Sequence, residues 1–134
     1  ILATDKIVPC FEIVDSRIDD WKIKIQDTIA DNASCGIFVL GEGSSSPEKF
    51  PMDELEVVVH KNGEFLSSGL GSAVQGHPAE AVAWLANTLG EYDIPLLKGE
   101  FILSGSLVPL EPAIAGDSFS LELKGVGTCE INFI

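Results

Sequence analysis

The sequence predicts an α+β fold that is mainly β. Short segments rich in β-branched and aromatic residues recur along the chain, glycines and prolines separate them, and one segment, residues 78–89, has the composition of a firm helix. The 134 residues suit one domain, and a hydrophobic content of 46% is enough for a packed core. We therefore expect about six or seven strands and one main helix.

The first half of the chain is predicted to form two strands linked by a short helix. Residues 7–14 are rich in β-branched residues, and because both alternating faces are apolar, we expect this strand to be buried on both sides. Pro9 places it near a sheet edge or a bulge. Residues 22–31 have a weak helical pattern. Residues 34–40 form the second strand, and a surface loop follows over residues 41–51.

The second half of the chain contains the clearest local signals. The segment Lys61-Asn62-Gly63 between residues 54–60 and 64–68 predicts a β-hairpin, because Asn and Gly both tolerate the positive φ angles of a tight turn. Three further strands are predicted at residues 101–104, 118–124 and 129–133.

The helix predicted over residues 78–89 has signals at both ends. Pro78 suits the first helical position, and Gly90 suits the position just past the end. Apolar residues occur nearly all round this helix. Because such helices are typical of protein interiors and interfaces, we expect this helix to be buried.

The net charge of the chain limits the classes of partner that it can bind. Eight Lys and Arg against 21 Asp and Glu leave a formal net charge of −13. An acidic chain without a basic cluster argues against nucleic acid or anionic lipid as a partner. An apolar run of the roughly 18 residues needed to cross a membrane is also missing. A negatively charged substrate would need a local positive charge to approach such a protein.

The cysteines indicate a reducing compartment. Cys10, Cys35 and Cys129 are odd in number and widely spaced, which favours a cytoplasmic protein over a disulfide framework. His60 and His77 lack partners at zinc-ligand spacing. The chain starts without Met and without the pattern of a signal peptide, so we expect residues 1–134 to be one domain from the interior of a longer chain.

Glu12 is the most informative single residue. A carboxylate in the middle of an apolar strand must be paired, hydrogen-bonded or bound to a metal, because burying it alone costs several kcal/mol. The residues by themselves favour an ion pair, with Arg17 or a lysine as the partner. A metal site is the alternative.

Two polar segments are further candidates for a site. Asp31, Asn32 and Ser34 lie between a predicted helix and a predicted strand, where they would either cap and turn the chain or form part of a site. Ser34 has no His or Lys at a telling spacing, so a nucleophilic triad is not supported. Ser104-Gly105-Ser106 follows a predicted strand and could present N–H groups and hydroxyls to an anion, although ordinary turn chemistry explains it nearly as well.

Several motifs together resemble a known family. Residues 9–18, Trp21 and residues 27–36 resemble the 2-keto-4-pentenoate hydratases of the fumarylacetoacetate hydrolase superfamily, which also contains the 4-oxalocrotonate decarboxylases. Later motifs occur in the same order, at residues 76–78, 83–86, 102–106 and 125–127. The resemblance covers essentially all 134 residues. It implies the C-terminal half of such an enzyme, with a mixed β-roll and little helix.

The resemblance also implies a divalent metal, Mg²⁺ or Mn²⁺, held by three carboxylates. Glu12 matches one of these ligands. The other two form a Glu-x-Glu pair that precedes it in the family, so Glu54-Leu55-Glu56, which follows Glu12, is not assigned to the site. The pair, together with the Lys and Asp used for proton transfer, is therefore expected in an upstream half that these residues do not include.

The activity implied by the resemblance is hydration. The substrate would be a 2-hydroxy-2,4-dienoate from aromatic meta-cleavage, converted into a 4-hydroxy-2-oxo acid. Ser34 and Asn32 match residues assigned to catalysis, with Ser34 a donor to the substrate or the attacking water. Ser104 and Gly105 match the segment at the substrate carboxylate. The enzymes of the family are oligomers, so we expect a homo-oligomer.

Three alternatives remain open at this point. The sister decarboxylase uses the same metal and the same enolate, and a C–C hydrolase acting on acylpyruvates is a weaker variant. The sequence of residues 21–36 resembles the hydratases more than the decarboxylases. A third possibility, from another class, is a catalytically inactive fragment or assembly module, stable only when neighbours cover its apolar surface.

Overall fold

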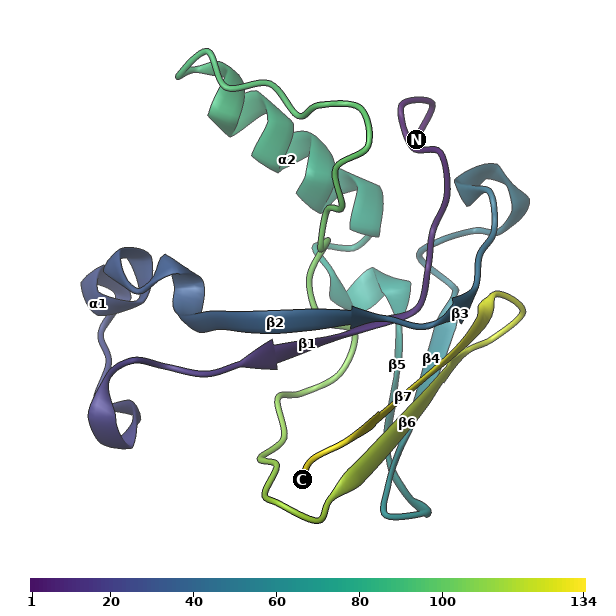
Figure 1. The fold of residues 1–134 in the computed structure, drawn as a ribbon. Coiled ribbons are helices and arrows are strands. Elements are labelled where there is room, and N and C mark those ends of the chain that lie inside the picture. The colour runs from purple at the N-terminus through teal and green to yellow at the C-terminus, as the bar shows by residue number, and fades with distance from the viewer.

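The computed structural model describes residues 1–134 and shows two antiparallel sheets with one long helix (Figure 1). The smaller sheet has the order β1-β2 and the larger sheet the order β3-β7-β6-β4-β5. The helices are α1 (Ile25–Ala30) and α2 (Pro78–Gly90). The strands are β1 (Cys10–Val14), β2 (Cys35–Leu40), β3 (Glu42–Gly43), β4 (Glu56–Lys61), β5 (Glu64–Leu70), β6 (Ser118–Leu123) and β7 (Gly127–Asn132).

The core lies on one face of the larger sheet. Val57 and Val59 alternate along β4 toward Leu121 of β6 and Cys129 of β7, and all four side chains are buried. The predicted hairpin is confirmed, since β4 and β5 meet at Asn62-Gly63, where φ is 54° and 83°. These strands are positioned by local turn chemistry and by alternation of apolar residues.

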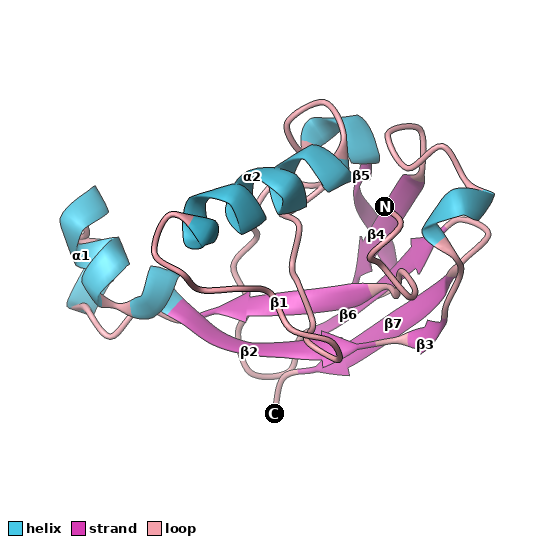
Figure 2. Cartoon of the chain, turned by 90° about the horizontal axis from the view of Figure 1, so that it is seen from above, coloured by secondary structure: helices cyan, strands magenta, loops and turns pink.

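The β1–β2 pair lies across the larger sheet and extends beyond it to α1 (Figures 1 and 2). Phe11 of β1 and Val39 of β2 pack against the core of the larger sheet. Glu12, which pairs with Phe38 in the register, is exposed. The prediction of a strand buried on both sides is therefore wrong, because Glu12 in the middle of β1 is exposed and the other residues of the strand are only half-buried. The strand also begins later, at Cys10.

Helix α2 begins as predicted. His77 is the N-cap, its Nδ1 accepts a hydrogen bond from the N–H of Ala79 at 3.0 Å, and Pro78 occupies the first turn. The expectation that the main helix is buried is not met within this chain, because none of its residues is buried and Trp84 is 60% exposed. Burial of the helix at an interface with another chain or segment stays a prediction. The helix stands above the sheets as a separate layer (Figure 1).

Two other local predictions need correction. Residues 101–104 do not form a strand; they belong to an irregular connection between α2 and β6. A strand requires a neighbouring backbone for its hydrogen bonds, and no strand of the structure pairs with residues 101–104. The loop predicted at residues 41–51 contains the short strand β3, which extends the larger sheet beside β7. The structure contains no helix long and apolar enough to span a bilayer.

Candidate active site

A large, mostly apolar cleft lies between β1, helix α2 and the connection that follows the helix. Its volume is about 1740 Å³. Glu12 lines it from β1, Ser104 and Gly105 line it from the connection, and Val82 and Ala83 line it from α2. Three of the residues predicted for a site therefore border one cavity, although they are far apart in the sequence.

Glu12 projects from the centre of β1 and forms no ion pair with Arg17 or with any lysine. The ion pair favoured by the residues alone is therefore absent. An exposed carboxylate is an oxygen donor of the kind that Mg²⁺ prefers. No group of three His, Cys, Asp or Glu side chains in the structure could hold a metal ion. Glu12 can thus serve as one ligand, and the remaining ligands would have to come from outside these residues.

Ser104 and Gly105 are held at the cleft by the packing of their segment. Gly105 has a φ of 122° and lies against Val74. Two residues further on, the carbonyl of Leu107 approaches Gly69 of β5 so closely that a side chain at position 69 would collide with it. This contact fixes the segment against the larger sheet. Ser104 and the N–H groups beside it can then face a carboxylate bound in the cleft.

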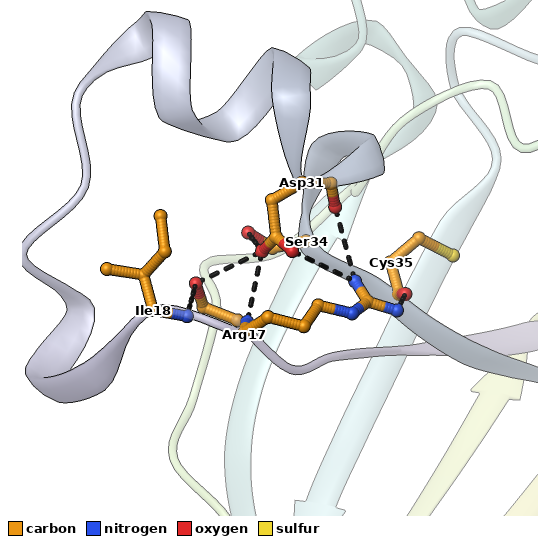
Figure 3. A network of polar contacts seen from close by, with 6 residues as sticks. Arg17, Ile18, Asp31, Ser34 and Cys35 are labelled. Atoms are coloured by element: carbon orange, nitrogen blue, oxygen red, sulfur yellow. Dashed lines mark hydrogen bonds and ion pairs between the residues drawn. The ribbon is translucent and has the colours of Figure 1, made fainter.

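A dense polar network closes the far end of the β1–β2 pair, and we call it the Asp31 network (Figure 3). Oδ2 of Asp31 accepts three hydrogen bonds, from the Ser16 hydroxyl at 3.2 Å, the Arg17 N–H at 3.1 Å and the Ser34 hydroxyl at 3.0 Å. The Ser16 hydroxyl in turn accepts from the N–H of Ile18. The network joins the residues that leave β1 to those that enter β2.

Arg17 adds a second set of contacts to the Asp31 network. Its guanidinium donates to the carbonyl of Asp31 at 3.2 Å and to that of Cys35 at 2.8 Å, and it lies 3.6 Å from Asp31 Oδ1 (Figure 3). Arg17 therefore anchors the loop after β1. The amino-acid sequence alone does not reveal Arg17 and Ser16 as the partners of Asp31, because the two segments are separated by a helix and meet only in the fold.

The residues that follow Asp31 have an unusual backbone. Asn32, Ala33 and Ser34 have φ angles of 53°, 56° and 54°, in the left-handed region. For residues with a Cβ this conformation costs about 1–2 kcal/mol each, and glycine avoids the cost. Ser34 is only 1% exposed, whereas Asn32 is exposed. A strained turn of this kind persists only where its surroundings hold it in place, and the Asp31 network provides those contacts.

The same network sets the charge of Asp31. Its side chain is 9% exposed. This desolvation raises the pKa, but the hydrogen bonds from Arg17, Ser34 and Ser16 and the charge of Arg17 outweigh it, so the pKa lies below its usual value. Asp31 is therefore an ionised acceptor at neutral pH.

The predicted site residues fall into two groups. Glu12, Ser104 and Gly105 line the cleft, whereas Ser34 and Asn32 are not among its lining residues. The groups are linked through Asp15, which lines the cleft and donates its N–H to the carbonyl of Ser34 at 2.8 Å. Glu54 and Glu56 lie in a different, shallow pocket beside Lys124, which is ion-paired with Glu56 at 2.7 Å.

Comparisons with known proteins identify the family of this chain. The family model described as fumarylacetoacetate (FAA) hydrolase C-terminal matches residues 7–134. A 2-hydroxyhexa-2,4-dienoate hydratase of Comamonas testosteroni is 62% identical over 133 residues, which are 99% of this chain and 50% of that protein. A 2-keto-4-pentenoate hydratase of Paraburkholderia xenovorans (strain LB400) is 44% identical over 98% of this chain and 49% of its own length.

A solved structure has the same fold. The 4-oxalocrotonate decarboxylase from Pseudomonas putida G7, complexed with magnesium and adipate, superposes with a TM-score of 0.91 at 38% identity, covering 97% of this chain and 49% of that one. The chain thus spans about half the length of the relatives it matches. The match over residues 7–134, the 62% identity and the shared fold show that this chain belongs to the fumarylacetoacetate hydrolase family.

Proposed function

We propose that this chain is the C-terminal, site-bearing half of a hydratase that adds water to a 2-hydroxy-2,4-dienoate and forms a 4-hydroxy-2-oxo acid. The observation that carries the proposal is the 62% identity to a 2-hydroxyhexa-2,4-dienoate hydratase over 99% of the chain. The cleft supports it, because it joins a free carboxylate at Glu12 to a Ser-Gly segment suited to a substrate carboxylate. We infer a place in aromatic meta-cleavage from the chemistry of that substrate class.

Glu12 is proposed as one ligand of a divalent ion, Mg²⁺ or Mn²⁺. Its exposed carboxylate on the cleft wall fits a hard cation, and the magnesium in the related decarboxylase structure supports that choice. When bound, such an ion supplies Lewis acidity to the substrate oxygens and offsets the repulsion expected from a chain of charge −13. The Glu-x-Glu pair expected upstream would complete the site.

The other residues of the site have roles that follow from their positions. Ser104 and the N–H of Gly105 would hold the substrate carboxylate at the cleft wall. Ser34 and Asn32 are proposed to act at the substrate or the attacking water from the turn at the end of the β1–β2 pair. The apolar lining of the cleft would exclude bulk water from the reacting carbons.

The choice of hydration over decarboxylation follows from the degree of similarity. The proteins named as hydratases are 62% and 44% identical to this chain, whereas the decarboxylase of known structure is 38% identical. Both reactions would draw on the Lewis acidity of a bound divalent ion, so the cleft as described fits either chemistry. A decarboxylase is therefore the second candidate, and an acylpyruvate hydrolase the third.

The whole protein is proposed to be a cytoplasmic homo-oligomer. The apolar residues exposed on α2 and β2, among them Trp84 and Ile37, are typical of surfaces that other chains or segments cover. All three cysteines are free, as expected in a reducing compartment.

The test uses the full-length protein that contains these residues. Loss of dienoate absorbance should depend on added Mg²⁺, and release of CO₂ from 4-oxalocrotonate should be much slower. Glu12→Ala should abolish hydration and weaken Mg²⁺ binding in calorimetry. Glu54→Ala is the matched control, because Glu54 belongs to the Glu-x-Glu sequence outside the cleft.

Each result separates the alternatives. Faster CO₂ release than hydration would favour the decarboxylase. Unchanged turnover and unchanged Mg²⁺ affinity in Glu12→Ala would refute the metal assignment. Absence of both activities in a folded, Mg²⁺-loaded protein would favour a non-catalytic module.

A further inference from the structure

We propose that Asp31 is a positioning residue of this reaction, which holds the hydroxyl hydrogen of Ser34 so that Ser34 Oγ can act only as a hydrogen-bond acceptor. The inference rests on the proposed function, in which Ser34 acts at the substrate or the attacking water. It also changes the role of Ser34, which the family resemblance implied to be a donor.

This role follows first from the direction of the hydrogen bond between Ser34 and Asp31. A serine hydroxyl has a single hydrogen and two lone pairs. Ser34 donates that hydrogen to Asp31 Oδ2 at 3.0 Å (Figure 3). Because a carboxylate that has lost its proton can only accept, Ser34 cannot reverse this bond while Asp31 is ionised. A water or substrate hydroxyl that meets Ser34 Oγ must therefore be the donor.

The surroundings of Asp31 make this arrangement rigid. Oδ2 also accepts from the Ser16 hydroxyl and the Arg17 N–H, so the carboxylate cannot rotate away from Ser34 without breaking two other hydrogen bonds. Arg17 holds the backbone on both sides of the turn, through the carbonyls of Asp31 and Cys35. A helix or turn cap would need one such bond, and this carboxylate accepts three.

The place of the turn connects it to the cleft. Ser34 is fully buried, at 1% exposure, and it lies in a run of three left-handed residues. Its carbonyl accepts the N–H of Asp15, which lines the cleft at the end of β1. A shift of Ser34 would therefore be transmitted to the cleft wall, and a misplacement of about 1 Å can lower a rate about 100-fold.

The experiment separates positioning from folding in the full-length protein. Three variants are Asp31→Ala, Ser34→Ala and the double variant that carries both changes. Asp31→Ala and the double variant are each also prepared with the additional change Ala33→Gly. Glycine adopts the φ of 56° at position 33 without strain, so Ala33→Gly should restore the thermal midpoint that Asp31→Ala lowers. Asp31→Asn keeps one acceptor oxygen for the Ser34 hydroxyl and is the conservative variant.

We expect Asp31→Ala to lower kcat about 10- to 100-fold with little change in KM. Ser34→Ala should lower kcat by a similar factor, and the double variant should be no slower than Ser34→Ala, because Asp31 acts through that hydroxyl. Ala33→Gly should restore the thermal midpoint of Asp31→Ala but not its kcat. Asp31→Asn should stay closer to the wild type than Asp31→Ala does.

Two results would overturn the inference. If Ala33→Gly restored kcat together with the thermal midpoint, Asp31 would serve the fold alone. If the effects of Asp31→Ala and Ser34→Ala multiplied, the two residues would act separately. Either result requires an active wild-type enzyme, so it is distinct from failure of the proposed function, in which the wild type itself hydrates no dienoate.

Discussion

Asp31 and Ser34 are joined by two hydrogen bonds, from the Ser34 N–H to the Asp31 carbonyl at 2.9 Å and from the Ser34 hydroxyl to the Asp31 carboxylate at 3.0 Å. The backbone bond closes the turn, and the side-chain bond fixes its serine. Since the carbonyl of Ser34 also accepts from Asp15, the pair determines where β1 ends relative to β2. Removing Asp31 should therefore affect both the stability of this turn and the geometry at the cleft, and Ala33→Gly should recover only the stability.

Arg17 should contribute to stability through the two carbonyls that it bonds. Arg17→Ala removes two charge-assisted hydrogen bonds, and we expect the free energy of unfolding to fall by about 1.5 kcal/mol in urea titration. Lys22→Ala is the matched control, because the side chains of Lys22 and Asp20 are 77% and 72% exposed and the pair should contribute about 0.3 kcal/mol or less. Equal losses for both variants would contradict this account.

Asp117 should make the stability of the larger sheet depend on acid pH. Hydrogen bonds from Lys61, Asn62 and the N–H of Ile114 lower its pKa to about 2. The folded pKa then lies below that of the unfolded chain, so the stabilisation is present above about pH 4 and is lost as the pH falls toward 2. Urea unfolding should show wild type more stable than Asp117→Asn at pH 7, with the difference shrinking between pH 4 and pH 2.

The control for Asp117 is Asp93→Asn, in the exposed turn after α2. No hydrogen bond or ion pair involves its side chain in the structure, so its unfolding curve should follow that of the wild type at every pH. A constant difference between wild type and Asp117→Asn from pH 7 to pH 2 would show that the carboxylate charge is not the cause.

Gly69 should resist substitution because the carbonyl of Leu107 occupies the space of its missing side chain. Gly69→Ala should force residues 104–108 away from β5, lowering the free energy of unfolding by about 1–3 kcal/mol and raising KM for a substrate held by Ser104. Gly90→Ala is the opposite case, since no atom lies within 4 Å of the place that its Cβ would take and the residue is the last of α2. Gly90→Ala should raise the free energy of unfolding by about 0.5 kcal/mol. Equal effects would refute the steric argument.

The 134 residues alone should differ from the full-length protein in solution. Because no group of three His, Cys, Asp or Glu side chains could hold a metal ion, the isolated chain should bind Mg²⁺ without measurable saturation in calorimetry. Because Trp84 and its apolar neighbours on α2 are not buried, the isolated chain should also bind a hydrophobic dye and self-associate. The full-length protein should bind Mg²⁺ saturably and bind less dye. Tight, stoichiometric Mg²⁺ binding by the isolated chain would contradict the single-ligand assignment of Glu12.

The features that depend on neighbouring residues in the chain could be predicted from the sequence. The turn at Asn62-Gly63 and the start of α2 at His77-Pro78 follow from backbone preferences and capping, and both were confirmed. The motifs around Glu12 and Ser34 identified the family, which the comparisons confirmed. These signals are local, so they do not depend on how the sheets pack.

What only the tertiary structure decided is which surfaces meet. Apolar alternation could not show that Glu12 is exposed, since that depends on whether a second layer covers its face of β1. The composition of residues 101–104 could not show that no strand lies beside them. Asp31 meets Arg17 across 14 residues and a helix, and the donors it gains there make it an ionised acceptor for Ser34. Long-range contacts of this kind leave no periodic trace in a single sequence, because they are set by packing between elements.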